Sequence, residues 1–100
     1  MKKVAIIGGD NKKGYEDKLK TLNFELKYHD GRIKRKRTKN YFSNLLKDVE
    51  CVIVILSAVS HGTMYAVKDV ADKFGIKVVY HRSKGISSVI NAVHENVAFY

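Results

Sequence analysis

The chain has 100 residues, which corresponds to one domain over residues 1–100 and suffices to bury a core without a disulfide or a structural metal. Nineteen Lys and Arg residues outnumber ten Asp and Glu residues, so the formal net charge is +9, and 45% of the residues are hydrophobic. Proline is absent and no stretch has a biased composition, which excludes disordered and collagen-like classes and leaves a basic globular domain.

The first half of the chain alternates between strand and helix patterns. Residues 4–7 form an apolar run that stops at two glycines, which predicts a strand buried on both faces. Residues 14–22 carry apolar side chains at helical spacing. Residues 24–28 alternate between apolar and polar side chains, which is typical of a strand with one solvent-exposed face. A turn-like segment at residues 29–32 and a basic run follow, and residues 41–49 then show a second helical face.

The second half begins with the most apolar run of the chain. Residues 51–56 are all hydrophobic, which is typical of a central strand. A loop follows in which Ser60 or His61 is expected near the start of the next helix. That helix carries its apolar face between residues 64 and 74, and Gly75 suits the position just after its end.

The last quarter of the chain predicts one more strand and one more helix. Residues 76–80 form a strand with a single charged interruption. Ser87 or Ser88 is expected to cap a helix whose apolar face includes residues 89–93. Residues 97–100 are expected to form a short final strand.

Four successive β-α units predict an α/β fold, a parallel sheet with helices on both faces in three layers. The two fully apolar strands, the first and the third, belong in the centre, and the second and fourth belong at the edges. This gives the strand order 2-1-3-4, a truncated version of the flavodoxin-like doubly wound arrangement.

A ligand in such a sheet binds beyond the carboxyl ends of the strands, where the strand order reverses. The loops that follow the four predicted strands gather three of the four histidines and several hydroxyl and charged groups at that edge. The expected ligand-binding residues are Gly8, Gly9, Asp10, His29, Asp30, Arg32, Ser57, Ser60, His61, Arg82, Ser83 and Ser87.

The chemistry of these loops favours an anion. They offer backbone N–H groups near Gly9, the Arg32 guanidinium, hydroxyl groups and imidazoles, with few carboxylates for a hard metal ion. Six of the residues are expected to line one pocket: Gly9, His29, Arg32, Ser60, His61 and Ser83. No metal site is predicted, and the predicted partner is a phosphate-bearing small ligand such as a nucleotide. Ordinary turns, helix caps and solvated charges stay open as alternatives for each loop.

Two other functions stay open. The basic run at residues 32–39 predicts an affinity for nucleic acid, with Lys34, Arg35, Lys36, Arg37 and Lys39 as the binding residues, unless it is a solvated loop without a partner. The other alternative is an enzyme that acts on a phosphorylated substrate with His29 or His61 as its acid or base.

The expected location is the cytoplasm. The longest apolar run is far shorter than the roughly 20 residues that cross a bilayer, and the N-terminus lacks the pattern of a signal peptide. The lone cysteine, Cys51, cannot form an internal disulfide and is expected in the core. Self-association is also predicted, most simply as a dimer through an edge strand or an exposed helix face. The fourth strand is the better candidate, because residues 78–80 offer too few charges to protect its edge.

The sequence resembles a bacterial family known as domain of unknown function 2325. The resemblance covers nearly the whole chain and runs through residues 4–9, residues 29–32, the apolar third strand, residues 59–61 and residues 83–88. It implies a flavodoxin-like fold and carries no established activity. The basic residues at 35–37 depart from the neutral or acidic stretch that members often have there.

Overall fold

A computed structural model describes residues 2–31 and 38–97, with the backbone only for residues 38–40. Strands and helices alternate along the chain as the sequence patterns predict. The elements are β1 (Lys2–Ile7), α1 (Lys12–Thr21), β2 (Phe24–His29), α2 (Thr38–Leu46), β3 (Cys51–Ile55), the 3-10 turn η1 (Leu56–Ala58), α3 (His61–Phe74), β4 (Lys77–His81) and α4 (Ile86–Asn96).

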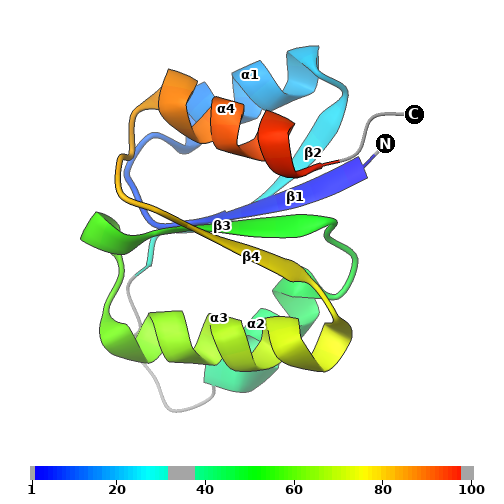
Figure 1. Ribbon diagram of the computed structural model, residues 1–100, viewed down its shortest axis with the longest axis vertical. Coiled ribbons are helices and arrows are strands. Elements are labelled where there is room, and N and C mark those ends of the chain that lie inside the picture. Colours follow the sequence, from blue (N-terminus) through cyan, green and yellow to red (C-terminus); the bar gives the residue numbers. More distant parts are fainter. Residues whose placement is uncertain (1, 32–37, 98–100) are drawn as a thin grey trace.

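The four strands form a parallel sheet in the order β2-β1-β3-β4, which confirms the predicted flavodoxin-like order (Figure 1). The strand ends are nearly level, since Ile7 at the end of β1 pairs with both His29 of β2 and Val54 of β3. In the same way Ile55 of β3 pairs with His81 of β4. The loops after all four strands therefore leave the sheet along one edge.

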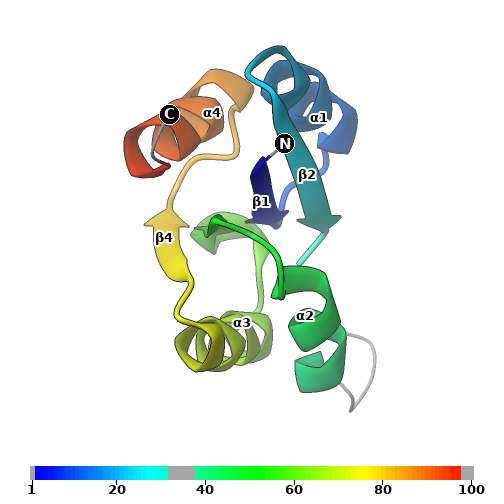
Figure 2. The same cartoon turned by 90° about the vertical axis from the view of Figure 1, so that its right-hand side faces the viewer.

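Helices cover both faces of the sheet and complete the three predicted layers. Helices α1 and α4 lie on one face, and α2 and α3 lie on the other (Figure 2). The sheet has a hydrophobic core on each face, and alternate residues of β1 pack into the two cores. Val4 and Ile6 pack against the α1/α4 layer, and Ala5 and Ile7 pack against the α2/α3 layer. Since every residue of β3 is also fully buried, the apolar runs of β1 and β3 mark the centre of the sheet.

Two predicted helix ends are confirmed. The Ser60 hydroxyl caps α3 and accepts the Thr63 N–H at 3.1 Å. Gly75 ends the same helix with a φ of 69°, a left-handed conformation that glycine adopts without a steric penalty. No helix within the described residues is long and apolar enough to cross a bilayer.

Other helix boundaries differ from the prediction. Helix α4 begins at Ile86 with Gly85 as its N-cap, so neither Ser87 nor Ser88 caps it. Helix α1 starts at Lys12 rather than at residue 14, because the Asn11 side chain accepts the Gly14 N–H and caps the first turn.

The expected strand at residues 97–100 is not tested beyond its first residue. Val97 ends α4, where its N–H bonds to the Val93 carbonyl. Residues 98–100 lie outside the described residues.

Candidate functional site

An open cleft of about 450 Å³ lies at the carboxyl edge of the sheet. It sits between the loops that follow β1 and β3, which is the point where the strand order reverses and where the sequence predicts a ligand. The loops after all four strands contribute to it. Its lining residues are Gly9, Asp10, Tyr28, Asp30, Ser57, Ala58 and Lys84.

Two glycines bring three of these loops into direct contact below the cleft. Gly8 has a φ of +109° and Gly31 a φ of +89°, both in the region that favours glycine. A Cβ atom on Gly31 would lie 2.5 Å from the Ala58 carbonyl oxygen and 3.3 Å from the Gly8 Cα. The Gly8 N–H also donates to the His29 carbonyl at 2.7 Å. The His29-Asp30-Gly31 segment therefore joins the loops after β1, β2 and β3.

Two tyrosines on the α1/α4 side of the sheet form hydrogen bonds with the backbone of the cleft loops. The Tyr28 hydroxyl donates to the Gly9 carbonyl, and the Tyr15 hydroxyl donates to the Lys84 carbonyl. Burial raises the pKa of Tyr28, and the carboxylates of Asp30 and Asp10 raise it further. Burial also raises the pKa of Tyr15. Both phenols therefore stay protonated and keep donating to the loop backbone.

The charged side chains of the cleft belong to Asp10, Asp30 and Lys84. The Asp10 carboxylate lies 3.9 Å from the Lys84 ammonium, and both side chains are exposed, so this pair is weak and free to rearrange around a ligand. Ser57 is less free, because its hydroxyl donates to the Arg82 carbonyl at 3.1 Å and ties the loop after β3 to the loop after β4.

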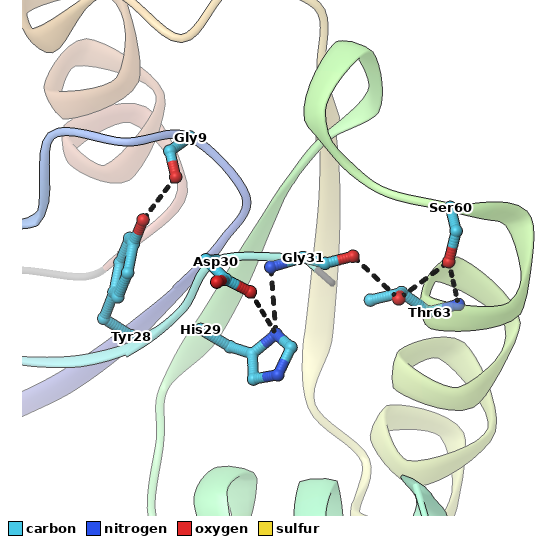
Figure 3. A network of polar contacts seen from close by, with 7 residues as sticks. All are labelled: Gly9, Tyr28, His29, Asp30, Gly31, Ser60 and Thr63. Atoms are coloured by element: carbon cyan, nitrogen blue, oxygen red, sulfur yellow. Dashed lines mark hydrogen bonds and ion pairs between the residues drawn. The ribbon is translucent and has the colours of Figure 1, made fainter. Parts of the chain in front are cut away.

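His29 lies on the opposite face of the sheet from the cleft residue Tyr28, as neighbours in a strand do (Figure 3). Its ring packs edge-on against Tyr41 and Phe42 of α2, with both centroids 5.1 Å away. Its Nδ1 accepts the Gly31 N–H at 2.9 Å, which places the proton of the neutral ring on Nε2. Burial lowers the pKa of His29, and the Asp30 carboxylate only partly opposes this effect.

This arrangement makes the stability depend on pH. The unfolded chain takes up a proton at His29 near its ordinary pKa of 6.5, whereas the folded pKa is lower. The free energy of unfolding is therefore expected to be fully retained above about pH 6.5 and to fall below it, until the folded ring is protonated as well. Urea unfolding between about pH 7.5 and about pH 5 would show this slope.

The matched variant is His29→Asn, whose side-chain oxygen replaces Nδ1 as the acceptor for the Gly31 N–H but does not titrate. It is expected to be less stable throughout, because the ring packing is lost, and to show a flatter pH slope. His61→Asn is the control for replacing a histidine by asparagine, and it is expected to change the free energy of unfolding little at about pH 7.5, because His61 is exposed. An equal slope in the wild type and the His29→Asn variant would contradict the assignment.

The structure brings only part of the predicted pocket together. Gly9, Asp10, Asp30 and Ser57 line the cleft, and Gly8 lies buried beside it. Arg32 lies outside the described residues, as do Lys34, Arg35, Lys36 and Arg37, and Lys39 lies in the part of α2 described by its backbone only.

The remaining predicted residues do not line the cleft. Ser60 caps α3, and His61 is exposed beside Tyr65 on the same helix, 6.4 Å away between ring centroids. The Ser83 hydroxyl accepts the Gly85 N–H at 3.1 Å. Arg82 contributes its carbonyl to the Ser57 bond, and Ser87 is exposed in the first turn of α4. Neither His29 nor His61 thus reaches this cleft as an acid or base.

Three lining residues are absent from the predicted set of ligand-binding residues: Tyr28, Ala58 and Lys84. The signal for Tyr28 was present, because Phe24, Leu26 and Tyr28 alternate along β2 and share the α1/α4 face. Ala58 and Lys84 have no such signal, since the paths of their loops decide which atoms border the cleft.

The described part of the chain contains no cluster of side chains that could bind a metal ion. There, no group of three His, Cys, Asp or Glu side chains comes close enough together to hold an ion. Cys51 is buried at the start of β3, where burial raises the pKa of its thiol to about 11, so it behaves as the core residue that the sequence predicts.

Comparison with known proteins places the chain among bacterial relatives. A UPF0751 protein of Desulfitobacterium hafniense strain Y51 is 39% identical over 94 residues, which cover 93% of this chain and 92% of the relative. A second protein of that strain and one of strain DSM 10664 / DCB-2 carry the same family name and are each 38% identical over 100 residues, or 97% of both chains. No solved structure matches the chain significantly. The family described as "Uncharacterized protein conserved in bacteria (DUF2325)" matches residues 3–96, and the chain belongs to this family.

Proposed function

We propose that this protein is a binding module for a small phosphate-bearing ligand, a nucleotide, at the carboxyl edge of its sheet. The observation that supports the proposal is the cleft of about 450 Å³ at the reversal of strand order. Its volume falls within the roughly 300–1,000 Å³ of small-molecule sites. Open parallel sheets bind their ligands at this position.

The charge of the chain and one cationic side chain in the cleft, that of Lys84, support an anionic ligand. A net charge of +9 attracts anions over a long range. Within the cleft, Lys84 offers an exposed ammonium group, and the turn at Gly9 exposes backbone to the ligand. The Tyr28 ring adds apolar surface against which a base can pack.

The test is binding of nucleoside mono-, di- and triphosphates to the full chain, measured by calorimetry and by thermal shift. A ligand that binds the native state raises the melting temperature. Lys84→Gln is expected to weaken the best nucleotide by about tenfold, because it removes one charge-assisted contact. The variant keeps the Lys84 carbonyl that Tyr15 bonds, so the apo melting temperature should stay nearly unchanged.

Lys20→Gln is the matched control, since it removes the same charge from an exposed position on α1. It is expected to leave nucleotide affinity within about twofold of the wild type, a change of about 0.4 kcal/mol. If no nucleotide and no inorganic phosphate binds the wild type, the proposed function is wrong.

We also propose self-association through β4, because the two edges of the sheet differ in charge. At the β2 edge, Glu25 lies within 4.0 Å of the ammonium groups of both Lys3 and Lys27, and charged edges resist pairing. The middle of β4 has no charge, and Tyr80 is 43% exposed. Light scattering is expected to show a dimer that Tyr80→Lys weakens and Leu22→Lys does not. A monomer at all concentrations would contradict the proposal.

A further inference from the structure

The edge strand β4 and helix α3 form one surface at the side of the sheet. Val78 packs into the core on the α2/α3 face, and Tyr80, two residues further along the strand, lies on the same face and is 43% exposed. Helix α3 covers that face next to β4, and α2 lies on its far side (Figure 2). A partner that extends the sheet at β4 therefore also meets α3.

Helix α3 carries an ion pair on the side that faces this edge. Its buried Thr63 faces the other way, toward the loop after β2, where its hydroxyl donates to the Gly31 carbonyl. Each residue turns the helix by about 100°, so Lys68 and Asp72 lie about 140° and about 180° around the helix from Thr63. The Lys68 ammonium donates to the Asp72 carboxylate at 3.2 Å, and both side chains are more than half exposed. Such an exposed pair is weak by itself and free to exchange partners.

The middle of β4 lies level with the part of α3 that carries this pair. A short turn joins the end of the helix to the start of the strand, so these two ends lie at the same level. Val79, the middle residue of β4, is two residues along the strand, a rise of about 7 Å. The same rise back along the antiparallel helix covers about four to five residues. It reaches a point between Lys68 and Asp72.

A second copy of the chain complements this surface. When a two-fold axis joins two copies of one edge strand, the strands run antiparallel and each face of the sheet keeps its own helices, so the two α3 helices also run antiparallel. Pairing centred on Val79 brings Tyr80 opposite Val78 of the second copy, and an aromatic side chain packs well against a β-branched one. The same pairing brings Lys68 of each α3 toward Asp72 of the other.

We propose that two copies of the chain pair their β4 strands antiparallel and that Lys68 of each copy bonds to Asp72 of the other. The inference rests on the proposed self-association and specifies the surfaces that meet. The four charges alternate in sign around the axis, and such a network contributes more than a single exposed pair. Two chains that each carry a net charge of +9 repel each other, so the interface needs this local attraction. The arrangement also keeps the two Lys77 side chains at opposite ends of the paired strands.

The test is the dissociation constant of the dimer, measured by sedimentation of the full chain over a range of concentrations in low salt. Lys68→Asp is expected to raise this constant at least about tenfold, because it turns two attractive contacts across the axis into repulsive ones. Asp72→Lys should raise it for the same reason. Lys20→Asp and Asp17→Lys make equal changes of charge at exposed positions on α1, so they should change the constant by less than about threefold.

Restoring the opposite charges should restore the dimer. The double variant Lys68→Asp/Asp72→Lys exchanges the two charges and is expected to bring the dissociation constant back to within about threefold of the wild type. An equimolar mixture of the two single variants should associate at least about tenfold more tightly than either variant alone, because one α3 is then negative at both positions and the other positive. The mixture tests the inference even if the double variant fails to fold.

The outcomes distinguish this inference from the proposed self-association. If the wild type forms a dimer that Tyr80→Lys weakens, but Lys68→Asp and Asp72→Lys act no more strongly than their controls, the inference is wrong and association through β4 stands. The inference is also wrong if both single variants weaken the dimer and neither the mixture nor a folded double variant recovers it. A wild type that stays monomeric at all concentrations contradicts both proposals.

Discussion

Replacing Gly31 with alanine is expected to lower the free energy of unfolding by about 3 kcal/mol, a large share of the ~5–15 kcal/mol that stabilises a typical domain. Two costs add up. The φ of +89° is strained for any residue with a Cβ atom, and that atom would lie 2.5 Å from the Ala58 carbonyl oxygen. The neighbouring atom belongs to the backbone, so it cannot swing away. Urea unfolding measures the loss.

Gly75→Ala is the matched control for this prediction. Gly75 also has a positive φ, of 69°, but a Cβ atom there would meet nothing within 4 Å. The control variant therefore has only the backbone cost, about 1 kcal/mol. If the two variants lose equal stability, the close approach of the loops after β2 and β3 does not restrict Gly31.

The strand order could be predicted because a strand that is buried on both faces has an uninterrupted run of apolar residues. Residues 4–7 and 51–55 are apolar without interruption, and each of them is fully buried. The start of α4 could not be predicted in the same way. Ser88 has the right residue type for a cap, but its hydroxyl bonds to Nε2 of His81 at 2.7 Å, and this partner on β4 depends on the tertiary fold.

The site was predictable in position and only partly in composition. Topology alone indicates the edge where the cleft lies, and four predicted residues line it. Which side chains enter the cleft depends on the side-chain direction along each strand and on the paths of the loops. Tyr28 and His29 are neighbours in one strand, yet the first borders the cleft and the second packs under α2. Strand alternation could have separated them, whereas the approach of Lys84 depends on a loop path that local sequence does not determine.

Two hydroxyl groups, those of the exposed Ser60 and the buried Thr63, connect α3 to the loop that carries Asp30. Thr63 is fully buried, and its hydroxyl donates to the Gly31 carbonyl at 3.0 Å (Figure 3). Because this bond uses the only proton of the Thr63 hydroxyl, the Ser60 hydroxyl must be the donor in the 2.9 Å contact between the two. The Thr63 N–H completes the group by donating back to Ser60.

Thr63→Val is therefore expected to lower the free energy of unfolding by about 2 kcal/mol, although valine has the same shape. It leaves the buried Gly31 carbonyl and the Ser60 proton without their partner. Ser60→Ala alone should cost about 1 kcal/mol, the usual effect of losing an N-cap. Since both residues belong to one hydrogen-bonded chain, the double variant should lose at least about 0.5 kcal/mol less than the two single losses combined. Additive losses in urea unfolding would show that the two hydroxyl groups act independently, and the loop that carries Asp30 would then not depend on the cap of α3.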